Sequence, residues 1–378
     1  MAKAVYIHIP FCTQICHYCD FNKVFLSGQP VDDYLAALKK EMEMTLVETP
    51  TEHVETVFIG GGTPTAINER HLERLLETIH QVLPLNGVIE FTIEANPGDL
   101  NEDKIRLLKD AGVNRLSLGV QTFDNELLKK IGRNHRDKDV YETVEIAKKI
   151  GFDNLSIDLM YRLPGQTMEH IRYALSELAK LDVSHASIYS LIIEPKTVFY
   201  NLMRKGKLLL PSEDTEADMY HYILEEMAIH GFEQYEISNF SKPGFESRHN
   251  LFYWNNDSYY GFGAGAHSYL NGNRSSNIGP VNHYIQALKE HRLPIKESIR
   301  VTKREQMEEE MFLGLRKTAG VSVHTFFQKY GVDPRNRYQE QVHNLTEQGL
   351  LEVTNGYIRL TKRGLFLGNE VFQSFIGV

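Results

Sequence analysis

The three cysteines of the chain lie within eight residues of one another, as Cys12-x3-Cys16-x2-Cys19. Thiolates are the ligands that iron–sulfur clusters use, and a cubane cluster has four irons to hold. Three thiolates on one tight loop therefore leave one iron without a protein ligand. An odd, closely spaced set of cysteines is also unlike a disulfide framework. We interpret this loop as a [4Fe-4S] site with one open iron.

Two other interpretations of the cysteines are open. A zinc site could combine the three thiolates with His8 or His17, and three buried free cysteines would bind nothing. The spacing, the position after the first expected strand and the flanking aromatic residues resemble the radical SAM signature. In that signature, S-adenosylmethionine chelates the open iron through its amino and carboxylate groups. An electron from the cluster then splits a carbon–sulfur bond of the cofactor.

Glycines and polar residues follow several of the expected strands. The run Gly60-Gly61-Gly62-Thr63-Pro64 comes after the second strand, where glycines would let the backbone approach a ligand closely. The same run could also form only a tight turn. Polar residues stand at or near the ends of later strands, namely Glu94, Gln121, Arg133 and Asp158. A charge within an apolar strand, as at Asp158, is costly unless it is paired or used. A buried ion pair of Asp158 with Arg133 is the structural alternative.

These residues are spaced by an alternation of strands and helices. Strands are predicted at residues 5–9, 57–59, 89–93, 115–118, 155–160 and 186–191. Helices are predicted at 31–48, 71–83, 102–111, 138–150 and 168–180, where apolar residues recur with helical spacing. This alternation predicts an α/β fold with a parallel sheet, closed or partly closed as a barrel. In such barrels the chemistry lies at the C-terminal ends of the strands.

The second half of the chain is less regular. A helix is predicted at 215–230 and a strand at 232–237. Residues 238–270 are rich in Gly, Asn, Tyr and Ser, and their sequence is too polar and irregular for simple repeats. From residue 300, three helices precede a hairpin with the turn Asn355-Gly356, as in a winged-helix module. Residues 301–378 carry ten Lys and Arg against nine Asp and Glu, which favours a docking or lid role over nucleic-acid binding. The predicted division is 1–200, 201–299 and 300–378.

Bulk composition narrows the class of protein. The 378 residues are 42% hydrophobic and 24% charged, as in a globular protein with a sizeable core. A net charge of −9 argues against a nucleic acid as the main partner. No run of eighteen apolar residues is present, and the first seven residues lead into a strand without a secretory h-region. We therefore expect a cytoplasmic protein.

Four motifs of the chain resemble the anaerobic coproporphyrinogen III oxidase family of radical SAM proteins. They are Tyr6-Ile7-His8-Ile9-Pro10-Phe11-Cys12, residues 60–65, residues 115–123 and Leu163-Pro164-Gly165-Gln166. The resemblance covers nearly the whole chain and implies a partial (β/α)6 barrel. By motif position it implies S-adenosylmethionine contacts from Tyr6, Gly61, Gly62, Thr63 and Glu94. It implies that Gln121, Arg133 and Asp158 match positions that line a second cofactor molecule in the oxidase.

Three departures point to the heme chaperone branch of that family. The oxidase branch has a further cysteine two residues after the third ligand, whereas Asp20-Phe21 follows Cys19 here. Only eleven residues precede Cys12, and the oxidase has a long N-terminal extension. Finally, residues 249–254, in what looks like a glycine-flanked loop, resemble the H-N-x-x-Y-W motif of the chaperone branch.

The histidine of this motif, His249, is the candidate heme ligand. An imidazole can ligate heme iron, and aromatic neighbours such as Tyr253 and Trp254 can cover the macrocycle. The alternative is that His249 is a hydrogen-bonded structural residue, one of sixteen histidines, and that the two aromatic residues serve packing.

The resemblance thus predicts a heme chaperone with a [4Fe-4S] cluster, S-adenosylmethionine and heme. Its implied partners are an electron donor and heme acceptor proteins such as respiratory cytochromes. It is compatible with peripheral membrane contact and with a dimer. The alternative is a coproporphyrinogen III oxidase, an enzyme that decarboxylates two propionate side chains. A nucleic-acid-directed radical SAM enzyme is disfavoured by the net charge.

Overall fold

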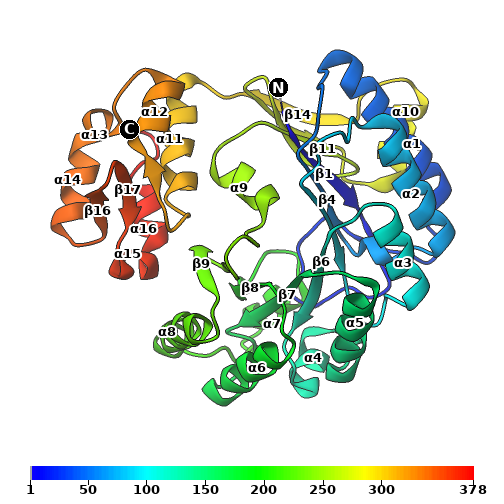
Figure 1. The fold of residues 1–378 in the computed structure, drawn as a ribbon, viewed down its shortest axis with the longest axis horizontal. Coiled ribbons are helices and arrows are strands. Elements are labelled where there is room, and N and C mark those ends of the chain that lie inside the picture. Colours follow the sequence, from blue (N-terminus) through cyan, green and yellow to red (C-terminus); the bar gives the residue numbers. More distant parts are fainter. Residues whose placement is uncertain (1) are drawn as a thin grey trace.

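The structure, a computed structural model, describes residues 2–378. Its centre is a curved, open sheet whose six middle strands run parallel in sequence order (Figure 1). These strands are β1 (Ala4–Ile9), β4 (Thr56–Gly61), β5 (Glu90–Ala95), β6 (Arg115–Gln121), β7 (Asn154–Tyr161) and β8 (His185–Ser190). The prediction of an α/β fold with a partial six-stranded barrel is confirmed.

Helices cover the outer side of this sheet, as Figure 1 shows. They are α1 (Val31–Glu48), α2 (Glu69–Val82), α3 (Glu102–Asp110), α4 (Asn125–Ile131), α5 (Asp137–Ile150) and α6 (Met168–Lys180). Only α4 was missing from the prediction. It is a helix of seven residues, too short to show a clear apolar period.

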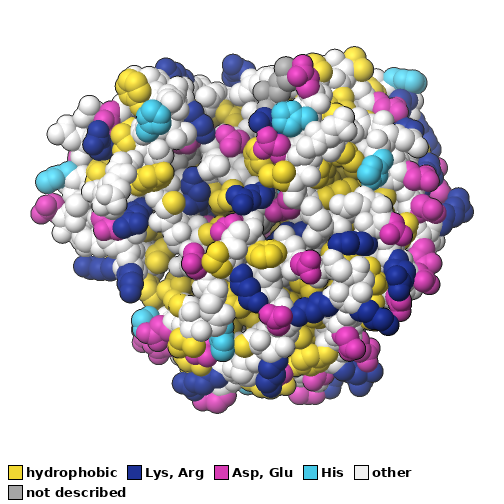
Figure 2. All heavy atoms as spheres, viewed as in Figure 1, with side chains coloured by type: hydrophobic (Ala, Val, Ile, Leu, Met, Phe, Trp, Pro, Cys, Tyr) yellow, Lys and Arg dark blue, Asp and Glu magenta, His cyan; other side chains and the backbone are white. Residues whose placement is uncertain are grey.

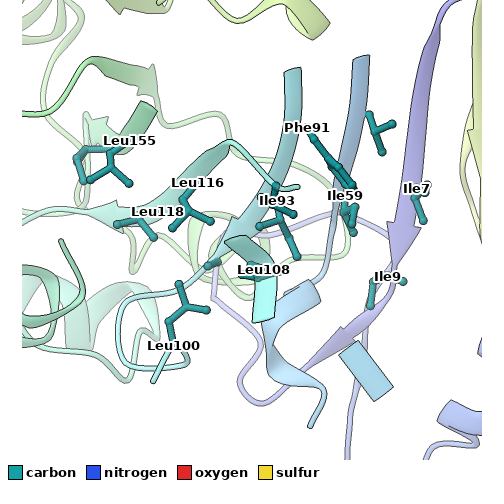
Figure 3. Packing of buried hydrophobic residues seen from close by; sticks show 14 of the residues in the cluster. Ile7, Ile9, Ile59, Phe91, Ile93, Leu100, Leu108, Leu116, Leu118 and Leu155 are labelled. Carbon is teal, nitrogen blue, oxygen red and sulfur yellow. The ribbon is translucent and has the colours of Figure 1, made fainter. Parts of the chain in front are cut away.

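Side chains alternate between the two faces of the parallel strands. Figure 3 shows Ile7, Ile59, Ile93 and Leu116 from successive strands packed with Leu108 of α3 in one apolar layer. Because neighbouring residues of a strand point to opposite faces, the residues between them face the interior of the half-barrel. That interior face is polar, and it carries the candidate site residues.

The sheet continues beyond the parallel strands at both ends. Next to β1 lie β11 (Tyr259–Phe262), β12 (His267–Leu270), β13 (Asn273–Asn277) and β14 (Ile295–Arg300); next to β8 lie β10 (Asn239–Ser241) and β9 (Glu233–Glu236). Helices α7 (Val198–Arg204), α8 (Glu213–Ile229), α9 (Arg248–Trp254) and α10 (Val281–Lys289) complete this part.

Residues 238–270, whose sequence shows no simple repeat, form short regular elements. That segment contains β10, α9, β11 and β12, which are each three to seven residues long. Elements of that length show almost no periodicity in the sequence. The predicted boundary at residue 200 lies inside α7, and the three-part division stays a prediction.

Residues 301–378 form a C-terminal module with a core of its own. It consists of α11 (Lys303–Gly314), β15 (Val321–Ser322), α12 (Val323–Tyr330), α13 (Pro334–Arg337), α14 (Gln339–Glu347), β16 (Leu351–Thr354), β17 (Tyr357–Leu360), α15 (Lys362–Phe366) and α16 (Gly368–Gln373). Asn355 and Gly356 both have positive φ, 51° and 80°, as the predicted type I′ hairpin requires. In Figure 1 the module faces the open side of the curved sheet.

Acidic and basic side chains are interspersed over the face of the molecule that Figure 2 shows. Among residues 2–378, every helix is either too short or too polar to cross a bilayer.

Candidate functional site

The three cysteines lie on the loop that follows β1. Cys12 ends the short strand β2 (Phe11–Cys12), which pairs in parallel with β3 (Val24–Phe25). Cys12 is buried, whereas Cys16 and Cys19 are partly exposed. The backbone N–H of Cys19 donates to the carbonyl of Cys16 at 3.3 Å, which makes the loop a tight turn between these two thiols. The loop therefore presents three thiols at the C-terminal end of the first barrel strand.

Distant parts of the chain hold this loop in place. The side-chain amide of Asn22 donates to the carbonyls of Ala264 (2.8 Å) and Gly279 (2.9 Å), and the backbone carbonyl of Asn22 lies 2.7 Å from Nε2 of His8. The His17 ring lies 2.9 Å from the carbonyl of Lys130 through Nδ1.

The two histidines that the zinc interpretation would need are engaged elsewhere. Nδ1 of His8 lies 2.9 Å from the hydroxyl of Tyr6, and its Nε2 is bonded as above. The His17 ring packs edge-on against Phe199. Within the described part of the chain, no three His, Cys, Asp or Glu side chains form a group arranged to hold a single metal ion, as a zinc site requires. A cubane cluster differs from a zinc site, because each thiolate binds a different iron.

The glycine run passes against the cysteine loop with no room for side chains. A Cβ on Gly62 would lie 2.9 Å from Sγ of Cys12 and 2.8 Å from the carbonyl oxygen of Phe11. A Cβ on Gly60 would lie 2.8 Å from Oε2 of Glu94. The backbone N–H of Gly61 donates to Oε2 of Glu94 at 3.0 Å. The run therefore approaches the cysteine loop and Glu94 closely, and its approach to a ligand stays a prediction.

A chain of polar side chains leads from Cys12 to a buried cation. The hydroxyl of Thr63 lies 3.8 Å from Sγ of Cys12 and accepts a hydrogen bond from the amide of Asn96 at 3.1 Å. Arg133 donates to Oδ1 of Asn96 and, at 2.9 Å, to the hydroxyl of Tyr18. Nε of Arg133 is buried and has no hydrogen-bond partner. A cavity beside this chain is lined by Cys16, Asn96 and Arg133.

The surroundings of Cys12 favour the neutral thiol in the absence of a metal. Burial raises its pKa to about 11, while the hydrogen bond from Thr63 and the charge of Arg133 act in the opposite direction. Iron binding would replace the proton, because thiolates and not thiols are metal ligands.

Two carboxyl groups lie inside the half-barrel. Burial, and then the neighbouring charge of Asp158, raises the pKa of Glu94 to about 7. Burial also raises the pKa of Asp158, and the charge of Arg115 opposes that shift. Asp158 accepts hydrogen bonds from the hydroxyls of Ser117 (3.2 Å) and Ser156 (3.4 Å).

The proposed ion pair of Asp158 with Arg133 is not among the ion pairs of residues 2–378, so that alternative was wrong. Arg133 bonds to Asn96 and Tyr18 instead. Gln121 has a positive φ of 68°, and its amide lies with Arg133 and Asn96 around Gly119, where a Cβ would be 3.1 to 3.4 Å from the three side chains. Gln121 and Arg133 thus meet near the C-terminal end of β6, and a role at a shared cofactor site stays a prediction.

His249 lies on the helix α9 and not in a loop, because Ser247 caps the helix by accepting from the N–H of Asn250. The residue is 1% exposed. Nδ1 lies 2.9 Å from the hydroxyl of Thr56, and Nε2 lies 2.8 Å from the hydroxyl of Tyr253. Burial and the charge of Arg115 lower its pKa to about 3. The imidazole is therefore neutral at physiological pH and has both nitrogens hydrogen-bonded in this arrangement.

A row of aromatic rings connects this helix to the cysteine loop. The ring of Phe58 stacks on Tyr6 at 6.1 Å between centroids and on His249 at 5.2 Å. Tyr253 meets His249 edge-on at 5.0 Å. The hydroxyl of Tyr6 in turn bonds to His8, next to the cysteine loop. The two sequence motifs are thus in contact through one intervening side chain.

Sequence reasoning missed several residues of the site. Tyr18 and Asn96 hold Arg133, and Asn22 holds the cysteine loop. Arg115 is 2% exposed and lies on the interior face of the half-barrel. The sequence of this strand alternates polar or small residues with apolar ones, so Arg115 shares a face with Ser117, Gly119 and Gln121. That alternation could have indicated that Arg115 belongs to the site. The long-range roles of Asn22 and Tyr18 had no local signal.

Together these residues fit a [4Fe-4S] cluster and S-adenosylmethionine. The loop offers three thiols, the glycine run brings backbone groups directly against the loop, and a buried guanidinium has an unpaired N–H beside the thiols. Backbone N–H groups and a guanidinium are suitable partners for a carboxylate such as that of a methionine moiety.

Two family models match the chain. Residues 6–178 match the radical SAM superfamily, and residues 301–367 match the HemN C-terminal domain. The solved structure of coproporphyrinogen III oxidase (HemN) from Escherichia coli, a radical SAM enzyme, superposes with a TM-score of 0.87. That match covers 100% of this chain and 90% of the other at 24% identity, and it shows a shared fold.

Two curated relatives are similar over nearly their whole length, and a third over about two thirds of it. The heme chaperone HemW of Bacillus subtilis is 53% identical over 376 residues, which cover 99% of both chains. HemW of Lactococcus lactis is 49% identical over 99% of this chain and 97% of its own. HemW of Escherichia coli is 38% identical over 70% of this chain and 69% of its own. The chain therefore belongs to the HemW family, the heme chaperone branch of the radical SAM proteins related to anaerobic coproporphyrinogen III oxidase.

Proposed function

We propose that this protein is a heme chaperone, which binds heme and passes it to acceptor proteins in the cytoplasm or at its boundary. The observation that carries the proposal is the full-length similarity to proteins named heme chaperone HemW, at up to 53% identity. The residues Asp20 and Phe21, in place of a further cysteine after Cys19, support the same branch. Respiratory cytochromes are the proposed acceptors, and an electron donor is proposed for the cluster.

The proposed cluster ligands are Cys12, Cys16 and Cys19. The proposed contacts of S-adenosylmethionine are Tyr6, Gly61, Gly62, Thr63 and Glu94, with Gln121, Arg133 and Asp158 at a second cofactor position. When bound, the cluster and S-adenosylmethionine supply one-electron cleavage of a carbon–sulfur bond. Glu94 keeps the N–H of Gly61 oriented, and Asn96 keeps Arg133 beside the thiols.

His249 is the proposed heme ligand. A neutral imidazole is the form that binds iron, and the low pKa of about 3 keeps His249 neutral. Tyr253 and Trp254 are the proposed aromatic neighbours of the macrocycle. Ligation requires that His249 give up its bond to Thr56 or to Tyr253, since each ring nitrogen is engaged.

Heme titration of the anaerobically reconstituted protein tests the proposal. We expect one heme per chain, with a Soret band that changes in His249→Ala. The matched control is His324→Ala, because His324 is exposed on the C-terminal module and should leave the band unchanged. An unchanged Soret band in His249→Ala would remove that residue as a ligand.

The same preparation separates the chaperone from the alternative enzyme. Coproporphyrinogen III, S-adenosylmethionine and a reductant are supplied, and protoporphyrinogen is measured. Formation of protoporphyrinogen at an enzymatic rate would contradict the chaperone proposal.

A further inference from the structure

The helix that carries His249 is anchored to the barrel at its N-terminal end. Glu90, at the start of β5, accepts hydrogen bonds from the backbone N–H groups of Arg248 (2.7 Å) and His249 (3.1 Å) and from the hydroxyl of Ser247 (3.2 Å). The His249 ring is itself bonded at both nitrogens. Iron ligation at Nε2 therefore requires the Tyr253 hydroxyl, which lies one residue before Trp254 on α9, to move away from the ring.

The other end of α9 is held by the C-terminal module. The guanidinium of Arg316 lies over the Trp254 ring, 4.7 Å from its centroid. The ammonium of Lys317 donates to the side-chain oxygen of Asn255, and that of Lys329 donates to the backbone carbonyl of Asn255 at 2.6 Å. Three cations of one module thus converge on two successive residues of the barrel.

This contact buries polar groups at a cost in free energy. Nε1 of Trp254 and Nε of Arg316 are both buried without a hydrogen-bond partner. Burial also lowers the pKa of Lys317 and of Arg316, so both cations are placed where their charge is disfavoured. A contact between well-packed, permanently joined surfaces would not be expected to leave two donors unsatisfied. The two unsatisfied donors therefore make this contact less favourable than a fully hydrogen-bonded one would be.

The C-terminal module is built so that it can move as a body. Its apolar core, which includes Met311, Phe326 and Phe375, forms a cluster separate from the barrel core. The two parts are joined mainly by polar links. Besides the contacts of Asn255, the amide of Asn256 donates to the carbonyl of Gln306 at 3.2 Å, and Lys329 pairs with Asp257 at 3.5 Å. At one edge the N–H of Thr318 donates to the carbonyl of Tyr235 at 3.0 Å.

At the other edge, Arg274 pairs with Glu309 at 2.9 Å. Polar interfaces between separate cores are typical of domains that move relative to one another.

We infer that the C-terminal module is a gate for heme, which keeps α9 closed and must release residues 254–257 before His249 can bind iron. The inference rests on the proposed heme chaperone function. If binding occurs only in the open form, the apparent affinity is reduced by the fraction of molecules that are open. Substitutions that weaken the contact should therefore make heme binding faster and tighter. A substitution that removes a residue touching heme should instead make heme binding slower and weaker.

The test uses the reconstituted full-length protein and free heme, followed at the Soret band in a stopped-flow instrument. In the wild type, the observed rate should rise with heme concentration to a plateau set by opening of the module. Lys317→Met removes one charge-assisted hydrogen bond of the contact and should raise the plateau on the order of tenfold. The matched control is Lys362→Met, because Lys362 is exposed in the same module and should leave the plateau unchanged.

A second variant and a second measurement guard against a folding defect. Arg274→Met removes the ion pair at the opposite edge and should also raise the plateau. Hydrogen exchange at the amide of Thr318 should be faster in the heme-bound wild type than in the heme-free protein.

The outcomes separate this inference from the proposed function. A wild-type rate that stays linear in heme, with both variants at the wild-type rate, would overturn the gate and leave the chaperone function intact. A wild type that binds no heme at all would overturn the proposed function, and the gate with it.

Discussion

Gly62 shows at the scale of one residue how little space separates the glycine run from the cysteine loop. A Cβ there would meet the Phe11 carbonyl oxygen at 2.8 Å and the Cys12 sulfur at 2.9 Å. The Phe11 carbonyl is a backbone group and cannot rotate away as a flexible side chain can. We therefore expect Gly62→Ala to displace the cysteine loop. The iron–sulfur absorbance after reconstitution should be reduced at least severalfold.

The control for this variant is Gly112→Ala. Gly112 has open space around its Cβ position but a φ of +82°. Alanine there should cost about 1 kcal/mol of stability through the left-handed backbone and leave the cluster absorbance intact. Full cluster content in Gly62→Ala would show that the loop is more adaptable than its packing indicates.

A second residue-scale prediction concerns Glu41 of α1, which is buried at the edge of the sheet. It accepts hydrogen bonds from Tyr284, Asn277 and the N–H of Gly263, but burial dominates and raises its pKa from 4.5 to about 7. Between these two pH values the folded state keeps a proton that the unfolded state has lost. Stability therefore falls as the pH rises through this window, by up to about 3 kcal/mol.

Urea unfolding of the wild type and Glu41→Gln at about pH 5 and about pH 8 measures this effect. The stability of the wild type relative to the variant should be lower at the higher pH. Glu43→Gln, an exposed position on the same helix, should show no such dependence. A wild-type advantage that grows with pH would contradict the assigned direction.

At this scale, many residues of the candidate site could be chosen from the sequence, but the residues that hold them in place could not. Gly61, Glu94, Gln121 and Arg133 could be chosen because strand ends and glycine runs are local patterns. Asn22 could not, because its partners lie 242 and 257 residues away. Contacts of that range leave no trace in spacing or composition.

At the scale of elements, a single carboxylate anchors the N-terminal end of α9. Glu90 accepts from two backbone N–H groups of the first turn and from the hydroxyl of Ser247. Glu90→Gln halves the number of acceptor oxygens and places an amide donor against backbone donors. We expect a loss of about 2 kcal/mol in stability, together with faster hydrogen exchange in residues 248–254.

Glu69→Gln is a suitable control for that prediction, because Glu69 is an exposed residue of α2. Unchanged exchange in α9 of Glu90→Gln would mean that the helix is held mainly by its contacts with the C-terminal module. That result would also bear on how far α9 must move for His249 to be freed.

Long elements were predicted well and short ones poorly, for a physical reason. The helices at 31–48 and 168–180 span several turns, so their apolar period is repeated, and the observed bounds agree. The helix α9 has seven residues and packs aromatic side chains on more than one side. Its sequence therefore shows no helical period, and its helical structure depends on packing against neighbouring elements.

For the whole molecule, the main feature is the presence of two apolar cores. The barrel core and the core of the C-terminal module share no buried residue in the described chain. We expect two calorimetric transitions, with a total enthalpy larger than the van 't Hoff value of either. Met311→Ala should lower the midpoint temperature of only one transition, because it should reduce the free energy of unfolding of the C-terminal module by about 2 to 5 kcal/mol.

The matching barrel variant is Leu116→Ala, which should lower only the other transition. One transition with equal calorimetric and van 't Hoff enthalpies would contradict this expectation and would also weaken the case for a movable module. The sequence predicted both units, since strand–helix alternation and a hairpin turn are local signals. It did not predict how the sheet extends beyond β1 and β8, because that depends on pairing between distant segments.

The tether made by Asn22 has a consequence for the order in which the protein is made. The ribosome synthesises Cys12, Cys16 and Cys19 near the beginning of translation, whereas Ala264 and Gly279 emerge some hundreds of residues later. During that interval the nascent thiols lack the carbonyl anchors that hold their loop in the finished fold. We therefore expect the cluster to be inserted when the chain is nearly complete. Truncated translation products should contain the three cysteines but should not retain the metal.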